Sequence, residues 1–188
     1  MTMRFLNIIF VLICLPVAVI AHVAICFLVK LTSRGPVLHW SKRIGQNNEL
    51  FLMPKYRTMK IDTPQLATHL IAQTGQSYLT PIGPYLRKTS LDELPQLWSI
   101  FKGDMNLVGP RPALFNQDDL KELRTKCGVQ QLKPGLTGWA QINGRDELSI
   151  PDKVSLDKYY LDNRNMALDF KIILLTIYKV FKRSNIQH

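Results

Sequence analysis

The sequence predicts a small domain of mixed helices and short strands that follows one N-terminal membrane segment. Three observations support this prediction. The 188 residues suit one domain with a short appendage, an uncharged apolar run covers residues 5–29, and a basic amphipathic stretch covers residues 169–183. The formal charge of +10 indicates an anionic partner, for which nucleic acid, an anionic membrane surface and a phosphorylated substrate are the candidates.

The apolar run from Phe5 to Val29 is the first element. At about 1.5 Å per residue it can cross a hydrocarbon core of about 30 Å. The basic residues that follow place its C-terminal side in the cytoplasm. A cleaved signal peptide is the weaker alternative, because the run continues past a passable cleavage site at Val19–Ala21. Pro16 lies near the middle, and the residues alone leave open a spanning helix and a helix–break–helix that returns to the same face.

One compact domain is expected after a Gly/Pro linker at residues 32–36. Its predicted elements are a hairpin formed by 37–40 and 50–53 around a turn at 45–48, and helices at 64–73, 117–126 and 152–161. Asn116 is the expected cap of the second of these helices, and Gly128 follows its end.

A further helix is expected at residues 169–183, where a helical projection separates two kinds of side chain. One side carries Lys171, Thr176, Lys179, Lys182 and Arg183, and the other carries Ile173, Leu174, Ile177, Val180 and Phe181. This pattern predicts a helix that lies in a membrane interface. Packing against the core of its own domain is the alternative.

Two adjacent carboxylates, Asp92 and Glu93, stand at the predicted start of another helix. A helix N-terminus keeps a carboxylate ionised and also attracts a phosphate, so the pair is a candidate for catalysis. Capping explains it without chemistry, since Ser90 and Glu93 form a capping box. Alternatively, Asp92 is itself the cap and Pro95 occupies the third helical position. Spacing alone leaves catalysis and capping open.

Arginines also follow Gly/Pro or Asn-Gly turns, as Arg111 does in Gly109–Pro112 and Arg145 does in Asn143–Arg145. An arginine held on a rigid turn suits planar, bidentate phosphate binding. A nucleic-acid binder would cluster its basic residues with aromatics along one element, so nucleic acid is not expected as a partner. The three cysteines form no C-x-x-C pair, which argues against a disulfide framework and against a zinc site.

In their order along the chain, these pieces resemble the small monotopic phosphoglycosyl transferases, the bacterial sugar transferases that start glycan assembly on a polyprenyl phosphate. The resemblance runs from the membrane segment nearly to the C-terminus. The matching pieces are Gly35–Val37, Arg43–Gly45, Pro54–Met59, Ser90–Gln96, Lys102–Met105, Val108–Pro112, Pro134–Arg145 and Leu156–Tyr160.

The resemblance implies a Mg²⁺-dependent transfer of a phosphosugar from a UDP-sugar to a polyprenyl phosphate such as undecaprenyl phosphate, with release of UMP. Asp92 would be the nucleophile of a two-step, ping-pong reaction that passes through a phosphosugar-aspartyl intermediate, and Glu93 would be the second member of the dyad. Both would hold the Mg²⁺ ion. Lys55, Arg111 and Arg145 would contact phosphate or substrate, and Asp157 would be a polar residue of the site.

The resemblance also implies a helix-rich α/β fold on the cytoplasmic face of the bacterial inner membrane. Residues 1–31 would form a re-entrant membrane helix with a break near Pro16, and residues 32–188 a catalytic domain with amphipathic interfacial helices. The family often has Ser-Pro at the break, where this chain has Leu15-Pro16. The expected partners are membrane lipid, polyprenyl phosphate and a UDP-linked sugar, which we expect to be an N-acetylated amino sugar. A homo-oligomer is compatible with this picture, and the chain resembles the family's minimal catalytic form.

Overall fold

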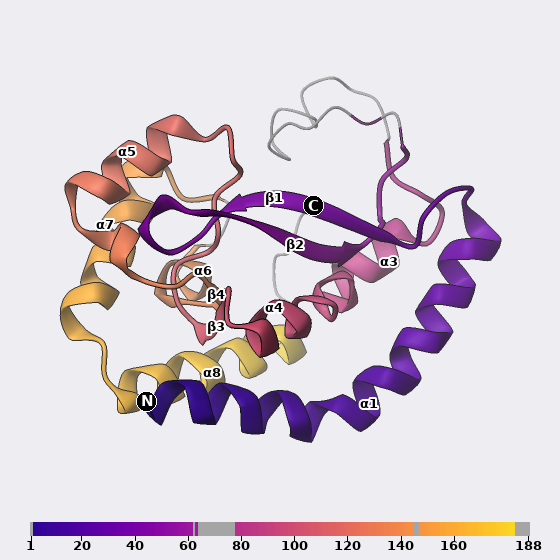
Figure 1. Cartoon of the computed structure of the whole chain (residues 1–188), viewed down its shortest axis with the longest axis horizontal. Helices are drawn as coiled ribbons and strands as arrows, with labels where there is room; N and C mark the ends of the chain where they lie inside the picture. Colours follow the sequence, from indigo (N-terminus) through magenta and orange to yellow (C-terminus); the bar gives the residue numbers. More distant parts are fainter. Residues whose placement is uncertain (1, 62, 64–77, 145–146, 183–188) are drawn as a thin grey trace.

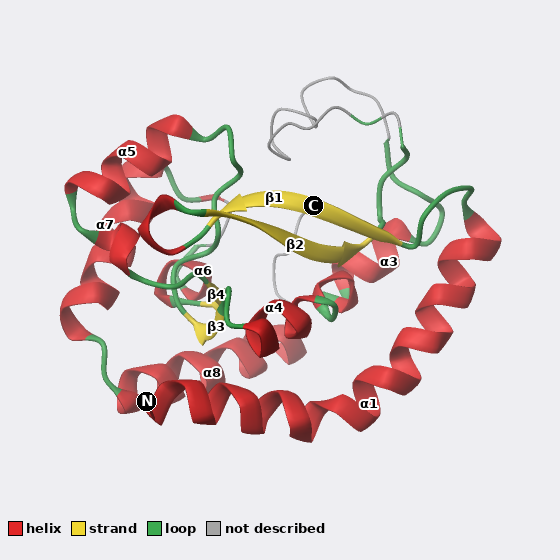
Figure 2. Cartoon of the chain, in the orientation of Figure 1, coloured by secondary structure: helices red, strands yellow, loops and turns green. Residues whose placement is uncertain are grey.

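The computed structural model describes residues 2–61, 63, 78–144 and 147–182, and within these ranges helices outweigh strands (Figure 2). The helix-rich α/β prediction is therefore confirmed at this level. The helix predicted at residues 64–73 lies outside the described residues.

The N-terminal apolar run forms α1 (Thr2–Thr32), one continuous helix with Pro16 inside it. Figure 1 shows that α1 is bent, so that its two halves point in different directions. A proline inside a helix removes one backbone hydrogen bond and kinks the axis, which accounts for a bend in this helix. The helix continues through Pro16 without interruption, and its re-entrant insertion in a membrane stays a prediction.

Most apolar side chains of α1 are exposed, including Phe5, Ile13, Val17 and Ile20. Residues Arg4–Thr32 are long and apolar enough to cross a membrane. The helix is nonetheless attached to the rest of the chain. Arg4 donates to the carbonyl oxygens of Ile100, at 2.6 Å, and Phe101. The buried Asn7 donates to Asn106 Oδ1 at 2.8 Å.

The predicted hairpin is confirmed as β1 (Leu38–Ile44) paired antiparallel with β2 (Leu50–Tyr56). Both strands are longer than the apolar runs that predicted them. The turn between them contains the short 3₁₀ helix η1 (Gln46–Asn48), in which Asn47 and Asn48 have positive φ angles. Met53 on β2 is buried with Val11 of α1 and Ile100, so the hairpin packs on the first half of α1.

After the hairpin come α3 (Gly83–Lys88), the 3₁₀ helix η2 (Leu91–Glu93) and α4 (Gln96–Lys102). Next, β3 (Asn106–Val108) pairs in parallel with β4 (Gly135–Thr137). Beside this pair the backbone at Gly135 passes very close to the backbone at Gly109. A Cβ added to Gly135 would lie 2.1 Å from the amide nitrogen of Gly109. A glycine is therefore required at the start of β4.

The remaining elements are α5 (Asp118–Lys126), η3 (Val129–Gln131), α6 (Trp139–Ile142), α7 (Ile150–Asn163) and α8 (Met166–Lys182). The helices predicted at 117–126, 152–161 and 169–183 correspond to α5, α7 and α8. The predicted cap of α5 is wrong. Gln117 rather than Asn116 occupies that position, and the Gln117 side chain accepts a hydrogen bond from the backbone of Leu114, which precedes the helix.

Helix α8 packs on its own domain, as one of the two alternatives expected, and its placement in a membrane interface stays a prediction. Ile172 is fully buried in a cluster with Val108, Ile142 and Tyr160, so one face packs on the domain's own core. Another face is apolar and exposed, with Phe170, Leu174, Ile177 and Tyr178 on it. Two of its lysines contact the domain: Lys179 donates to the carbonyl of Ile142, and Lys171 lies over the Trp139 ring.

Candidate active site

The two adjacent carboxylates lie in η2, in the turn between α3 and α4. Ser90 immediately before them adopts a left-handed conformation with φ 55°, and α4 begins after Pro95. Neither Ser90 nor Pro95 makes a side-chain capping bond. Both capping predictions for Ser90, Glu93 and Asp92 are therefore wrong, because the carboxylates precede α4 in a separate 3₁₀ turn rather than occupying its first turn.

Two cations from distant parts of the chain converge on these carboxylates. Lys55 on β2 places Nζ 2.8 Å from Glu93 Oε1 and 3.9 Å from Asp92 Oδ2. Arg111, three residues beyond β3, places its two terminal nitrogens 3.4 and 3.3 Å from the same Glu93 oxygen. The structure thus brings together Lys55, Asp92, Glu93 and Arg111, four of the residues that the sequence indicated.

Burial dominates the electrostatics of this cluster. It raises the pKa of the Asp92 carboxyl above its usual range, and the neighbouring Glu93 raises it further, against the lowering effects of Lys55, Arg87 and Arg111. Burial also lowers the pKa of the Lys55 ammonium, although Glu93 and Asp92 oppose that change. Titratable groups with pKa values displaced by burial and by specific partners are typical of functional sites.

Arg87 on α3 is a site residue that the sequence reasoning missed. Its Nε donates to Thr58 Oγ1 at 3.0 Å, and its positive charge lowers the pKa of Asp92. A local signal for it existed, since Arg87 follows the Gly83-Pro84 start of α3 by one turn. The pattern is looser than at Arg111, which follows Gly109-Pro110 directly.

Asp157 pairs with Arg124, which contacts the backbone of Arg111, and it does not join the cluster around Asp92 and Glu93. It is 1% exposed, and its Oδ2 accepts from Arg124 Nε at 3.0 Å and from Arg124 Nη2 at 2.6 Å. The remaining Arg124 nitrogen donates to the backbone carbonyl of Arg111 at 2.9 Å. Asp157 and Arg124 therefore support the segment that carries Arg111. Arg145 lies outside the described residues.

A cavity of about 980 Å³ opens beside the dyad. One wall is apolar and comes from α1, η2 and α4, with Ile13, Val17 and Leu97 among its residues. Glu93 and Arg111 also line the cavity, so their charges meet an apolar space. Such a cavity can accept a molecule with an anionic end and a hydrocarbon end.

A buried Asp92 beside a partly buried Glu93, with clustered cations and an apolar helix at one cavity, defines a class of proteins suited to an anionic substrate with an apolar part. The family model described as "Bacterial sugar transferase" matches residues 1–183, and the chain belongs to this family. The resemblance found in the sequence is thereby confirmed.

Three relatives illustrate the range of the family. Uncharacterized sugar transferase EpsL of Bacillus subtilis is 40% identical over 181 residues, which are 95% of this chain and 85% of EpsL. The UDP-glucose:undecaprenyl-phosphate glucose-1-phosphate transferase of Escherichia coli is 37% identical over 165 residues, 84% of this chain and 35% of that protein. The UDP-N-acetylgalactosamine-undecaprenyl-phosphate N-acetylgalactosaminephosphotransferase of Aeromonas hydrophila is 34% identical over 180 residues, 93% of this chain and 42% of that protein. The chain thus spans less than half of the last two.

Proposed function

We propose that this chain transfers a phosphosugar from a UDP-sugar to a polyprenyl phosphate, which yields a polyprenyl diphosphosugar and UMP and begins glycoconjugate assembly at the membrane. The observation that carries this proposal is that Glu93, with Asp92 adjacent to it in the chain, pairs with Lys55 and Arg111 at the edge of a cavity with an apolar wall. The names of the relatives from E. coli and A. hydrophila describe reactions of this kind.

In the first step, an Asp92 oxygen attacks the β-phosphorus of the UDP-sugar. A bond forms between that oxygen and phosphorus, and the bond from the β-phosphorus to the bridging oxygen breaks. UMP leaves with the electron pair, and the phosphosugar stays on Asp92 as an acyl phosphate. Carboxylates are competent nucleophiles for such covalent catalysis.

In the second step, a phosphate oxygen of the polyprenyl phosphate attacks the same phosphorus. The bond to Asp92 breaks, the carboxylate is regenerated, and the polyprenyl diphosphosugar leaves. The apolar wall formed with α1 suits the hydrocarbon chain of this acceptor. Lys55 and Arg111 would offset the phosphate charge in both steps, since a diphosphate otherwise repels a carboxylate.

Mg²⁺ is part of this proposal, with Asp92 and Glu93 as its protein ligands. Among the described residues, no cluster of three or more acidic, histidine or cysteine side chains could hold a metal. Two carboxylates nevertheless fit Mg²⁺, which proteins commonly bind through one or two carboxylates together with substrate phosphates. When bound, the ion would neutralise diphosphate charge.

We place the chain on the cytoplasmic face of the bacterial inner membrane as a monotopic protein. The exposed apolar surface of α1 and the exposed apolar face of α8 support lipid contact, because apolar patches of this kind are rarely left in water. The bend in α1 supports a helix that enters the membrane and returns to the same face (Figure 1). Reagents that label one side only should then find both termini cytoplasmic.

The covalent route predicts that a UDP-sugar without lipid releases one UMP per active chain and leaves a phosphosugar on the protein. Intact-mass spectrometry after incubation with single UDP-sugars would detect the adduct and identify the sugar. The series should include N-acetylated amino sugars, our first expectation, together with glucose and galactose. If UMP appeared only in the presence of polyprenyl phosphate and no adduct formed, the covalent step would be wrong.

The acid limb of the pH–activity profile should report the ionisation of Asp92, which must be charged to attack. Because burial raises its pKa, activity should fall at a higher pH than an ordinary aspartate would give. Lys55→Met removes a lowering influence and should move the acid limb to higher pH, whereas Glu93→Gln removes a raising influence and should move it to lower pH. The measurement is kcat/KM for UMP release against pH, and shifts of equal sign in the two variants would contradict the assignment.

A further inference from the structure

Four consecutive residues at the end of β2, Lys55 to Thr58, contact two different parts of the molecule. Lys55 binds Glu93, and Thr58 accepts a hydrogen bond from Arg87, whose charge acts on Asp92. Tyr56 and Arg57, which lie between them, instead bind residues of α1 and of the two positions that follow it. This segment therefore joins the membrane helix directly to two of the cations of the active site.

In the contact through Tyr56, the tyrosine is buried and its partner His22 is exposed on α1. Tyr56 is 2% exposed and its hydroxyl shares a hydrogen bond of 2.6 Å with His22 Nδ1 on α1. The two rings lie 5.6 Å apart between centroids. Ile25 and Val29, one and two turns further along α1, pack with Tyr56 in the same buried cluster. The second half of α1 is thus fixed against the end of β2.

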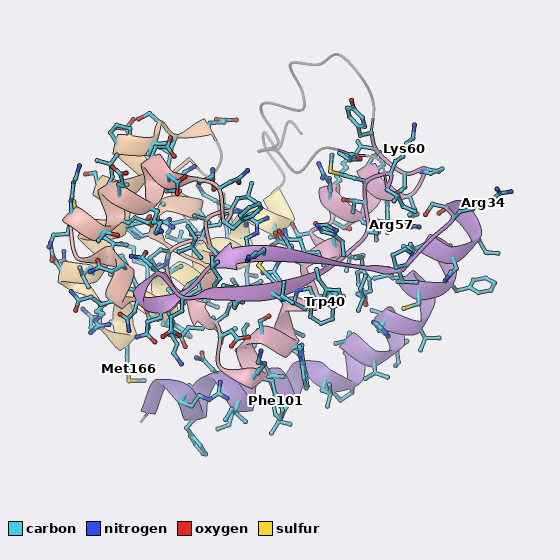
Figure 3. The ribbon with its side chains drawn as sticks, turned by 45° about the horizontal axis from the view of Figure 1, so that its top comes forward. Arg34, Trp40, Arg57, Lys60, Phe101 and Met166 are labelled. Atoms are coloured by element: carbon cyan, nitrogen blue, oxygen red, sulfur yellow. The ribbon has the colours of Figure 1, made fainter. Side chains whose placement is uncertain are left out.

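The second contact is made by Arg57, which binds the two residues just beyond the C-terminal end of α1. Its guanidinium donates to Arg34 O at 2.6 Å, to Ser33 O at 3.1 Å and to Ser33 Oγ at 2.6 Å. A cation at a helix C-terminus also stabilises the carbonyl dipoles there. Gly35 permits the approach, since a Cβ at that position would lie 2.2 Å from Arg57 Nη1. Figure 3 shows Arg34 and Arg57 together at the end of the molecule where α1 stops.

A shift of α1 would therefore move the cations near the dyad. Neighbouring residues of an extended segment are only about 3.3 Å apart, so a displacement of Tyr56 passes to Lys55. The Lys55–Asp92 separation is already 3.9 Å, and Coulomb energy between partly buried charges changes steeply at such distances. Misplacing catalytic groups by about 1 Å can cost about 100-fold in rate.

We propose that Tyr56 and Arg57 are positioning residues. Through them the position of α1 determines the positions of Lys55 and Arg87, and so the reactivity of Asp92. The inference rests on the proposed function, because reactivity is measured as phosphosugar transfer. It assigns the end of β2 a role beyond substrate contact: correct docking of the membrane helix becomes a condition for full activity.

The test compares Tyr56→Phe, which removes only the hydroxyl, with His22→Phe, which keeps a ring on α1, and with the double variant. Steady-state UMP release with polyprenyl phosphate is measured against UDP-sugar concentration, which gives kcat and KM separately. Each single variant should lower kcat about 10-fold, with a smaller change in the KM for the UDP-sugar, because Arg111 is held separately by Arg124. The double variant should be no worse than either single one.

Tyr85→Phe is the matched control, since Tyr85 lies exposed on α3 and the same atom is removed there. A Tyr56→Phe protein that melts at a lower temperature but keeps the wild-type kcat would show a purely structural role and overturn the inference. Additive losses in the double variant would also overturn it. If the wild-type protein itself released no UMP, the proposed function would fail, and this inference with it.

Discussion

Asp92→Asn is expected to lower UMP release by at least about 1,000-fold, the scale of loss seen when a nucleophile is removed. The amide cannot form the acyl phosphate, although it has nearly the same size and hydrogen-bonding reach. The phosphosugar adduct should disappear together with turnover. Lys55 and Arg111 remain in the variant, so binding of the UDP-sugar should persist.

The same substitution should leave the fold intact or make it more stable at neutral pH. Burial raises the pKa of Asp92, so the folded chain favours the protonated carboxyl. That preference stabilises the fold below the usual pKa of 3.8 and is lost as the pH rises through the raised value. Above it the ionised carboxylate opposes folding, and a neutral amide removes this cost. Stability given up for activity is common at catalytic sites.

The measurements are UMP release, adduct mass and thermal unfolding at pH 7, in the same detergent or bilayer. Asp162→Asn is a suitable control, because it makes the same chemical change at an exposed carboxylate that pairs with Lys158 on the surface of α7. Full turnover by a protein whose measured mass confirms the Asp92→Asn substitution would exclude Asp92 as the nucleophile.

Local patterns predicted the hairpin, α5, α7 and α8, because each depends on apolar periodicity and on turn residues within a short stretch. The strands exceeded their apolar runs because pairing continues through polar residues such as Lys42 and Arg43, which pair with Leu52 and Phe51. The capping predictions around Asp92 failed because the carboxylates lie in their own 3₁₀ turn, which follows the left-handed Ser90 and is separated from α4 by Leu94 and Pro95. A turn of that kind leaves no signature in the spacing.

The composition of the site was partly predictable and its geometry was not. Motifs indicated Lys55, Asp92, Glu93 and Arg111, but only the fold shows that Lys55 and Arg111 share one Glu93 oxygen. Partners that lie far apart in sequence have no local signal at all. The His22–Tyr56 bond and the Arg124–Asp157 pair join residues 34 and 33 positions apart, and each partner alone resembles an ordinary polar residue.

The buried Arg124–Asp157 pair gives the second large expected effect. Asp157→Ala would leave the Arg124 guanidinium buried without its carboxylate, and breaking such a pair costs about 3–5 kcal/mol of folding stability. Thermal or denaturant unfolding should therefore show a strong loss. Activity should fall as well, because Arg124 also holds the backbone carbonyl of Arg111.

The double variant Arg124→Met/Asp157→Leu separates these two effects. Replacing both members of a buried ion pair by apolar side chains of similar size is often neutral or stabilising, so most of the lost stability should return. The hydrogen bond from Arg124 to the carbonyl of Arg111 is still missing, however, so kcat/KM for UMP release should stay low. Recovery of both stability and activity would mean that the pair serves folding alone. A stable but slow enzyme would show that Asp157 acts on the reaction through Arg124 and the backbone of Arg111, which gives a physical role to a residue that the family resemblance placed in the site.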